Sequence, residues 1–308
     1  MKSLVIPERL RKGDLIGLIA PSSPTRNPER ISRGISYFLS HGYYVRIGGS
    51  VETRDGYLAG SDLLRVQDIH DMFSDHRVGA ILCTRGGYGA GRLLDLIDYD
   101  LLRAHPKILV GFSDVTALSM AMLARSGLLT FHGPMVAAEF GDAPTDVAEQ
   151  AFWNMLTQAV PQRVLSLGDE GSLRDGVAEG RLTGGNLAVY ASLVGTPYLP
   201  DPSGNILFLE DVGENTYRLD RMLLQLKHAG ILRAVAGVVL GSFSAIPADA
   251  PDRELETVLR EYLSPLDVPV MTGFPFGHIP DKVTLPLGAR VRLDTNKRQL
   301  TVLQAVVS

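Results

Sequence analysis

The chain has 308 residues, of which 45% are hydrophobic and 21% are charged, and its formal net charge is −4. This composition is that of an ordinary globular protein, and the length predicts either two domains or one large α/β unit. No nucleic-acid partner is expected, because such a partner requires a clustered excess of Lys and Arg. The single cysteine, Cys83, excludes a disulfide framework and a cysteine-rich zinc module.

The apolar run near the N-terminus, Leu4 to Ile6, is short and ends at Pro7. A secretory signal needs roughly seven or more consecutive apolar residues, and a membrane span needs about twenty. No other stretch approaches the second length without charges or prolines. We therefore expect a cytoplasmic protein with no membrane partner.

The first half of the chain alternates between the patterns of strands and of helices. Continuous apolar runs predict strands at 15–19, 43–47, 78–83, 107–111 and 128–131. Helical patterns lie between them, at 28–41, from 61 onward, at 114–125 and at about 145–155. The first of these helices has Asn27 as N-cap, Pro28 at its first position and Gly42 as a C-terminal stop. Alternating β and α segments with fully apolar strands predict a parallel sheet that is covered on both faces.

The chain becomes rich in glycine and acidic residues between 167 and 180, which is typical of a linker. Beyond it, strands are predicted near 206–209, 235–240 and 268–271. The segments 289–293 and 299–306 alternate between polar and apolar residues, as antiparallel edge strands do. We therefore predict a first domain at 1–160, a linker at 161–179 and a mixed α+β second domain at 180–308.

Ser113 lies between an apolar strand pattern and an apolar helix pattern. A serine on such a turn has its hydroxyl above the carboxyl edge of the sheet, next to the free amides of a helix N-terminus. Gly111 suits a cramped turn because it has no Cβ, although Val115 stands where the α/β-hydrolase form of this turn has a glycine. Two interpretations follow: Ser113 is a nucleophile, or it is the N-cap of the helix, with Asp114 in the first turn.

A serine nucleophile needs a base, and an imidazole base needs a group that fixes its tautomer. His278 follows an apolar strand in a loop with two glycines and two prolines, where a positioned base is expected. The alternative is an exposed loop histidine. His132 follows a strand of the first sheet and is a second candidate for the edge that carries Ser113.

Glu210 comes directly after the apolar run 206–209. A carboxylate at the end of a buried strand is partly shielded from water, so it can orient an imidazole and stabilise its charged form. The alternative is that Glu210 or its neighbour Asp211 caps the following helix.

Five segments, in this order, resemble segments of the LD-carboxypeptidase family, which comprises the murein tetrapeptide carboxypeptidases and their microcin-immunity relatives. These segments are Ile19–Ser23, Arg85–Gly89, Gly111–Asp114, Leu209–Glu214 and Gly277–His278. Together they extend over almost the whole chain.

The resemblance implies a flavodoxin-like N-terminal domain, similar to class I glutamine amidotransferases, and a smaller β-rich C-terminal domain. It also implies a triad of Ser113, His278 and Glu210 that is drawn from both domains. Members of the family are typically homodimers, and their serine chemistry needs no cofactor and no metal.

The substrate that the resemblance implies is murein tetrapeptide, from which the enzyme would release the terminal D-alanine during peptidoglycan recycling. The amides of Asp114 and Gly87 would then form the oxyanion hole. Arg85, Gly86 and Ser22 are expected to contact the substrate, Arg85 by binding a free carboxylate. For Arg85 the alternative is a salt bridge that braces the loop.

Other functions remain open. A microcin-immunity-type peptidase would cleave an aminoacyl-nucleotide amide, although the family members of that branch are longer than this chain. A cysteine hydrolase would use Cys83, which lies inside a predicted strand, where cysteine is usually inert. A metallohydrolase is not expected, since the sequence has no His-x-x-x-His ligand pair. The non-enzyme alternative is a nucleotide- or sugar-binding α/β module, but the glycines at 86–91 match neither a dinucleotide fingerprint nor a phosphate loop.

Overall fold

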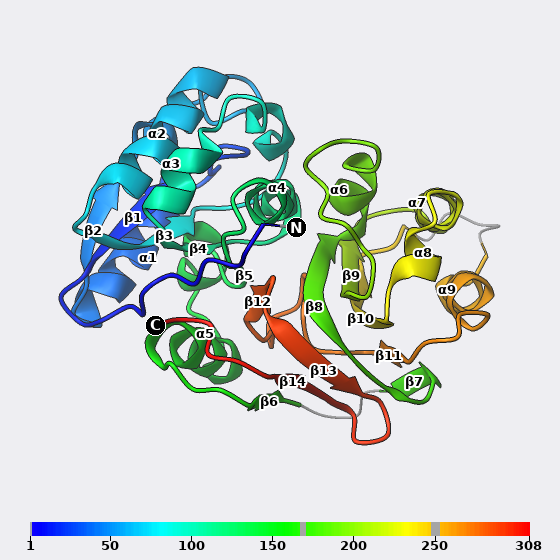
Figure 1. Ribbon diagram of the computed structural model, residues 1–308. Helices are drawn as coiled ribbons and strands as arrows, with labels where there is room; N and C mark the ends of the chain where they lie inside the picture. Colours follow the sequence, from blue (N-terminus) through cyan, green and yellow to red (C-terminus); the bar gives the residue numbers. More distant parts are fainter. Residues whose placement is uncertain (1, 167–170, 248–252) are drawn as a thin grey trace.

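Two β-sheets lie next to each other in the computed structural model, which describes residues 2–166, 171–247 and 253–308 (Figure 1). The first sheet has six strands in the order β12-β5-β4-β3-β1-β2. In that order its strands are Leu285–Leu287, Thr130–His132, Ile108–Val110, Val78–Cys83, Leu15–Ile19 and Tyr44–Ile47. Strands β1 to β5 are parallel, and their order 2-1-3-4-5 is that of a flavodoxin-like sheet. The predicted parallel sheet and its flavodoxin-like type are therefore confirmed.

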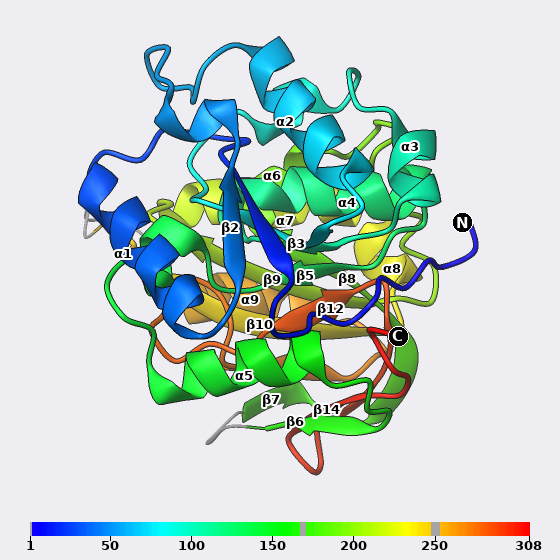
Figure 2. The same ribbon diagram turned by 90° about the vertical axis from the view of Figure 1, so that its left-hand side faces the viewer.

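Helices cover both sides of this first sheet (Figures 1 and 2). They are α1 (Pro28–Ser40), α2 (Asp62–Ser74), α3 (Tyr99–Ala104), α4 (Thr116–Arg125) and α5 (Asp146–Thr157). Short helical turns connect them: η1 (Gly49–Glu52), η2 (Ala90–Leu93), η3 (Ser113–Val115) and η4 (Val136–Phe140). Asn27 caps α1 by accepting from the Glu29 amide, as the sequence predicts, and Ser61 caps α2 by accepting from the Leu64 amide. No helix in the described part of the chain is long and apolar enough to cross a membrane.

The second sheet has eight strands in the order β6-β14-β13-β8-β9-β10-β11-β7. In that order they are Arg163–Leu165, Gln299–Val302, Arg290–Asp294, Val177–Asn186, Ile206–Val212, Gly237–Ser244, Val270–Thr272 and Gly171–Arg174. Strands β8 to β11 are parallel and the outer strands are antiparallel. The helices of this half are α6 (Leu187–Ser192), α7 (Thr216–His228), α8 (Ile231–Ala234) and α9 (Leu255–Leu263).

Strands occupy much of the segment 161–179, for which the sequence predicts a linker. Strands β6 and β7 and the first residues of β8 fall within it, while 167–170 lie outside the described residues. β6 and β7 are the two edge strands of the second sheet and are largely exposed. Exposed edge strands tolerate polar residues on both faces, so their sequences do not differ from that of a linker.

Strand β12 connects the two halves of the chain. It comes from the C-terminal half but pairs antiparallel with β5 of the first sheet, with Leu285 opposite His132. Buried apolar residues of both halves form one contiguous core. Because β12 follows the loop at 273–284 directly, this pairing brings that loop to the edge of the first sheet that carries Ser113.

Candidate active site

Ser113 is the first residue of η3, on the tight turn that follows β4. Its φ of +62° is in the left-handed region, which costs a residue with a side chain about 1–3 kcal/mol and is found mainly at functional sites. Gly111 makes the turn possible, since a Cβ on it would lie 2.8 Å from Val115 Cγ1. The strain is thus imposed by a sharp passage from strand to helix.

Ser113 does not cap a helix. Phe112 is the cap residue of η3, and no side chain accepts a hydrogen bond there. Helix α4 begins after Val115 and likewise has no side-chain cap. The N-cap interpretation of Ser113 is therefore wrong, and the geometry leaves its hydroxyl without a structural role in the helix.

The loop after β3 covers the Ser113 side chain at Gly86. A Cβ built on Gly86 would lie 2.9 Å from Ser113 Cβ, 3.0 Å from its Oγ and 3.4 Å from the Asp114 nitrogen. Gly87 has a φ of +119° and packs against Ser23 in the same way. Only residues without a Cβ allow this loop to come so close to Ser113.

Unpaired backbone amides lie on the Ser113 turn and on the glycine loop next to it. The N–H groups of Gly86, Gly87 and Asp114 donate to no acceptor within the described residues. The Arg85 Nε–H donates to the Gly86 carbonyl over 3.1 Å. Because the C=O and N–H of a trans peptide point in opposite directions, this contact also fixes the direction of the Gly87 N–H. Such amides can donate hydrogen bonds to an oxygen on which negative charge develops.

His278 and Glu210 form a close pair from the second half of the chain. His278 Nδ1 lies 2.7 Å from Glu210 Oε2, and the carboxylate is fully buried in the C-terminal half of β9. Gly277 has a φ of +105°, and a Cβ on it would lie 2.8 Å from the same Oε2. A glycine is therefore needed before His278 to let the imidazole reach the carboxylate.

Asp211, next to Glu210, has a different function. Its carboxylate accepts from Asn186 Nδ2 and from the backbone amide of Ala188, both over 2.9 Å. It thus holds the first turn of α6, which precedes β9 in the sequence. The expectation that Glu210 or Asp211 caps the helix after β9 is not met, since Glu210 binds His278 and Asp211 supports an earlier helix.

Ser113 and His278 line one cleft of about 650 Å³, a size that suits a small molecule or a short peptide. No hydrogen bond joins the two side chains, and in enzymes without substrate such contacts are often long. The cleft lies at the carboxyl ends of β1 and β3, where a flavodoxin-like sheet changes direction and binds its ligands.

The cleft contains four cationic side chains and two carboxylates. Arg30 pairs with Asp142, and Lys282 pairs with Glu139 over 2.5 Å. Arg26 and Arg85 also line the cleft and have no carboxylate partner among the described residues. Burial lowers the pKa of Arg85, and Arg26 and Arg30 lower it further by repulsion. Two guanidinium groups are thus available for a ligand with carboxylates.

Comparisons with known proteins agree with this geometry. Residues 16–133 match the model of the LD-carboxypeptidase N-terminal domain, and residues 179–293 match that of its C-terminal domain. A probable murein peptide carboxypeptidase of Bacillus subtilis is 38% identical, over 98% of this chain and 95% of its own. The chain belongs to the LD-carboxypeptidase family.

Solved structures of this family have the same fold. The muramoyltetrapeptide carboxypeptidase of Oxalobacter formigenes superposes with a TM-score of 0.84 and is 35% identical, with 93% of this chain and 97% of that one covered. The microcin C7 self-immunity protein MccF of Escherichia coli superposes with a TM-score of 0.93 at 27% identity, with 99% and 100% covered. Both branches of the family therefore share this architecture.

The residues expected to contact substrate in this family member lie in different environments. Arg85 and Gly86 line the cleft, and a contact with the Gly86 carbonyl takes the place of the salt bridge that was the alternative for Arg85. Ser22 is fully buried and does not line the cleft. It donates to Asp114 Oδ2 over 2.6 Å, so the prediction that it contacts substrate is replaced by a supporting position behind the nucleophile.

Two cleft residues are missing from the sequence-based prediction. Lys282 is buried, and its Nζ lies 4.1 Å from the centroid of the Phe112 ring, next to Ser113. Glu139 lies on η4, which has the wide turns of a π-helix, a form that is frequent at functional sites. Lys282 is only four residues from His278, and this spacing is the signal that could have revealed it.

Two other candidates are excluded as catalytic groups by burial. His132 is surrounded by Phe112, Phe208 and Phe276, and burial lowers the pKa of its imidazole to about 3. Cys83 is fully buried in β3, and burial raises the pKa of its thiol far above neutrality. A thiolate at position 83 is therefore not accessible.

Proposed function

We propose that this protein is a serine LD-carboxypeptidase that releases the terminal D-alanine from murein tetrapeptide in peptidoglycan recycling. The observation that supports it most is the convergence at one cleft of a strained serine, a carboxylate-bound histidine and unpaired amides. Each of these features alone has a structural explanation. Their combination is that of an acyl-transfer site.

The proposed mechanism begins with the attack of Ser113 Oγ on the carbonyl at the L-centre of the diamino acid. His278 accepts the hydroxyl proton and returns it to the amine of the departing D-alanine. Glu210 holds the imidazole by its Nδ1 and stabilises the imidazolium that forms. A water molecule, deprotonated by the same histidine, then hydrolyses the acyl-enzyme.

The oxyanion of the tetrahedral intermediate would be bound by the amides of Asp114 and Gly87. Neither amide has an acceptor among the residues that the structure describes, and Gly86 lies against the Asp114 nitrogen. Donors that are fixed before the reaction stabilise the developing charge without reorganisation. Loss of one such donor typically costs about 10²–10³-fold in kcat.

The free carboxylate at the end of the peptide would bind to Arg85. This guanidinium is half-buried at the glycine loop, within the same cleft as Ser113. A buried, unpaired guanidinium binds a carboxylate with two parallel hydrogen bonds. An exopeptidase needs such a group to distinguish a chain end from an internal peptide bond.

A microcin-immunity-type activity is the second candidate, because MccF has been solved in complex with aspartyl sulfamoyl adenosine. A nucleobase is usually held by stacking on an exposed aromatic ring. No tyrosine or tryptophan of the described residues lines the cleft, and Phe112 is buried. The only tryptophan, Trp153, stacks on Tyr43 elsewhere in the fold. These features favour the peptide over the nucleotide.

The cytoplasm is the proposed location, on the basis of the short apolar runs in the sequence, and a homodimer is the proposed assembly, on the basis of the family resemblance. Cell fractionation and light scattering after gel filtration test the two statements. A monomeric mass across the working concentration range would contradict the second.

The decisive experiment offers the protein L-Ala-γ-D-Glu-diaminopimelate-D-Ala and, separately, an aminoacyl sulfamoyl nucleotide. Mass spectrometry is expected to detect D-alanine from the first and no cleavage of the second. A pentapeptide that ends in D-Ala-D-Ala serves as the control for L,D selectivity and should remain intact. Cleavage of only the nucleotide would assign the second candidate, and cleavage of neither would refute the enzyme.

A further inference from the structure

Arg65 on α2 is the largest fully buried side chain of the described residues. Its guanidinium donates to the Pro21 carbonyl and to the Asp62 carboxylate, while its Nε has no partner within the described part of the chain. Burying a charged group is costly unless hydrogen bonds compensate it. An arginine at this position therefore needs an explanation beyond the filling of space.

The Arg65 guanidinium lies against the loop that carries the proposed oxyanion donor. Gly89 has a φ of +132°, and a Cβ on it would lie 2.6 Å from Arg65 Nη1 and 2.7 Å from Leu58. Arg65 thus supports the loop backbone only two residues beyond Gly87. A bulkier or shorter side chain at position 65 would displace this loop relative to Ser113.

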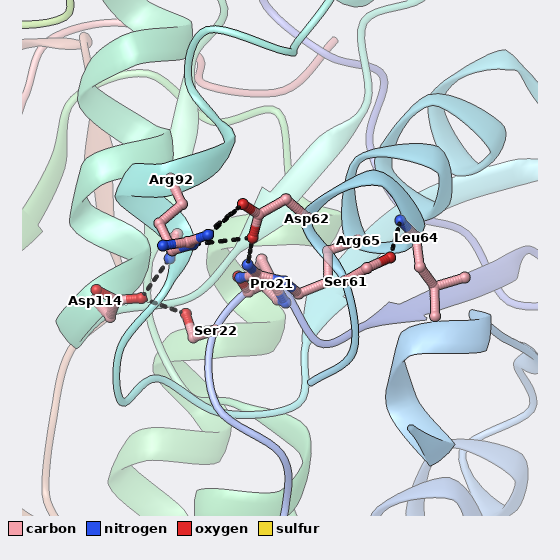
Figure 3. A network of polar contacts seen from close by, with 9 residues as sticks. Pro21, Ser22, Ser61, Asp62, Leu64, Arg65, Arg92 and Asp114 are labelled. Atoms are coloured by element: carbon pink, nitrogen blue, oxygen red, sulfur yellow. Dashed lines mark hydrogen bonds and ion pairs between the residues drawn. The ribbon is translucent and has the colours of Figure 1, made fainter. Parts of the chain in front are cut away.

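The same loop is bound to the nucleophile turn through Asp114 (Figure 3). Asp114 Oδ2 accepts from the Ala90 amide over 2.8 Å and from Ser22 Oγ over 2.6 Å. Ser22 directly follows Pro21, whose carbonyl accepts from Arg65. Arg65 and Asp114 are therefore connected twice, through the Pro21–Ser22 segment and through the Gly89–Ala90 segment.

Asp62 and Ser23 complete the attachment of the loop. Asp62 binds Arg65 and also Arg92 of η2, with Arg92 Nη2 at 2.7 Å from its Oδ2 (Figure 3). Ser23 Oγ accepts from the Tyr88 amide over 3.1 Å. The loop from Gly86 to Ala90 is consequently held at Tyr88 and at Ala90, and Arg92 is held directly after it.

The charge of Asp114 makes this network relevant to the reaction as well as to the fold. Its carboxylate belongs to the residue whose amide would bind the oxyanion, and an uncompensated negative charge there opposes a second one. Burial raises the pKa of Asp114, whereas Ser22, the Ala90 amide and Arg65 lower it. The cationic Arg65 and the two donors compensate the carboxylate inside the protein.

We propose that Asp62, Arg65, Ser22 and Asp114 form a positioning network that sets the distance between the Gly87 and Asp114 amides around Ser113. The inference rests on the proposed serine chemistry and assigns a role to four side chains that do not themselves contact the substrate. The network acts on the tetrahedral state, in which the oxyanion forms, and its four side chains are not among the residues that line the cleft.

The test measures how fast a fluorophosphonate labels Ser113, followed by intact mass spectrometry. In this reaction Ser113 Oγ bonds to phosphorus, fluoride leaves with its bonding electrons, and the hydroxyl proton passes to His278. The rate depends on the nucleophile and the oxyanion hole but not on peptide recognition. Rates are expressed per folded molecule, with the folded fraction taken from circular dichroism.

Ser22→Ala is expected to slow labelling about tenfold, the effect of one lost buried hydrogen bond. Arg65→Met and Asp114→Ala are expected to slow it about 10²-fold, since a displacement of about 1 Å has that effect. Asp114→Asn keeps an acceptor oxygen for Ser22 and Ala90 and should label at least tenfold faster than Asp114→Ala. With the peptide, kcat falls by the same factors while KM stays within about twofold.

Matched controls separate this role from ordinary packing. Ser126 is a fully buried serine that donates to Met122, and Arg103 donates to the Ser3 and Ser126 carbonyls. Ser126→Ala and Arg103→Met are expected to lower stability but to label at the wild-type rate. If Ser22→Ala and Asp114→Ala also label at the wild-type rate per folded molecule, the network is only structural and the proposal is wrong.

The outcomes also separate this proposal from the proposed function. A wild-type protein that is labelled at Ser113 but releases no D-alanine refutes the substrate and leaves the labelling test valid. A wild-type protein that is not labelled refutes the nucleophile and the network together. If Arg65→Met does not fold, Ser22→Ala and the two Asp114 variants decide the question.

Discussion

Ser113 and His278 reach the same cleft from different sheets, and the two sides are built by different means. On the Ser113 side, backbone geometry dominates: a left-handed φ, closely packed glycines and a buried polar network. On the His278 side, one buried carboxylate and one glycine position the imidazole. The first side is fixed by many small contacts, whereas the second depends on one contact. The consequences of substitutions should differ accordingly.

The largest loss of activity is expected on removal of the proposed nucleophile, the Ser113 hydroxyl. Ser113→Ala should lower kcat about 10⁶-fold, because a triad loses nearly all its function with any one of its central members. D-alanine release from the tetrapeptide is the measurement, with Cys83→Ala as a control that should retain activity. Residual activity within about tenfold of wild type would exclude Ser113 as the nucleophile.

Loss of the contact between His278 and Glu210 is expected to have the next largest effect on kcat. Glu210→Gln should lower kcat on the order of 10⁴-fold, since an amide favours the wrong imidazole tautomer and does not stabilise its charge. Asp211→Asn, at the neighbouring position, is the comparison and should mainly lower stability. Equal losses of kcat in both variants would mean that Glu210 has no special role.

The glycine loop of the Ser113 side is predicted to be sensitive to one added methyl group. Gly86→Ala places a Cβ 2.9 Å from Ser113 Cβ and displaces the loop, so kcat should fall about 10²–10³-fold, as when an oxyanion donor is lost. Gly91→Ala is the matched control, because a Cβ there has no neighbour within 4 Å. A Gly86→Ala enzyme with wild-type kcat would contradict the packing argument.

The equivalent change on the other side is Gly277→Ala. Its Cβ would lie 2.8 Å from Glu210 Oε2 and would separate the carboxylate from His278, with a loss of about 10²-fold in kcat. The two alanine variants should differ in their pH dependence: Gly277→Ala alters the profile, since it perturbs the base, and Gly86→Ala does not. Identical profiles would show that both glycines act on the same step.

The smallest effect concerns stability alone. Ser113→Gly relieves the left-handed strain that Ser113→Ala retains, so the glycine variant should be more stable by about 1 kcal/mol. Urea unfolding of the two inactive variants measures the difference. A more stable alanine variant would mean that the turn stores no strain.

The sequence predicts those parts of the fold that have strong local patterns. The apolar strands at 15–19 and 78–83, the cap at Asn27 and the start of a helix at about 61 are observed as expected. Edge strands β6 and β7 are not predictable in this way, because they bury too little to require an apolar pattern. The pairing of β12 with β5 depends on contacts between residues about 150 positions apart, which no local pattern records.

The candidate site shows the same division. Ser113, Glu210 and His278 each have an alternative interpretation when taken alone, and the resemblance of five ordered segments to one family is what singles them out as a candidate triad. Ser22 is misassigned because a motif residue can support the site from behind as well as line it. Lys282 and Glu139 are missed because they belong to an ion pair between distant segments, and neither residue is unusual in its own surroundings.

Strand β12 has a consequence for attempts to exchange the two halves between family members. It completes the first sheet at β5, so a fragment that ends before residue 180 leaves the β5 edge and its apolar side chains open. Open edges recruit other strands, and such a fragment should aggregate. A hybrid made by joining one member's N-terminal half to another's C-terminal half inherits a foreign strand in its own sheet. Successful chimeras will need β5 and β12 from the same parent.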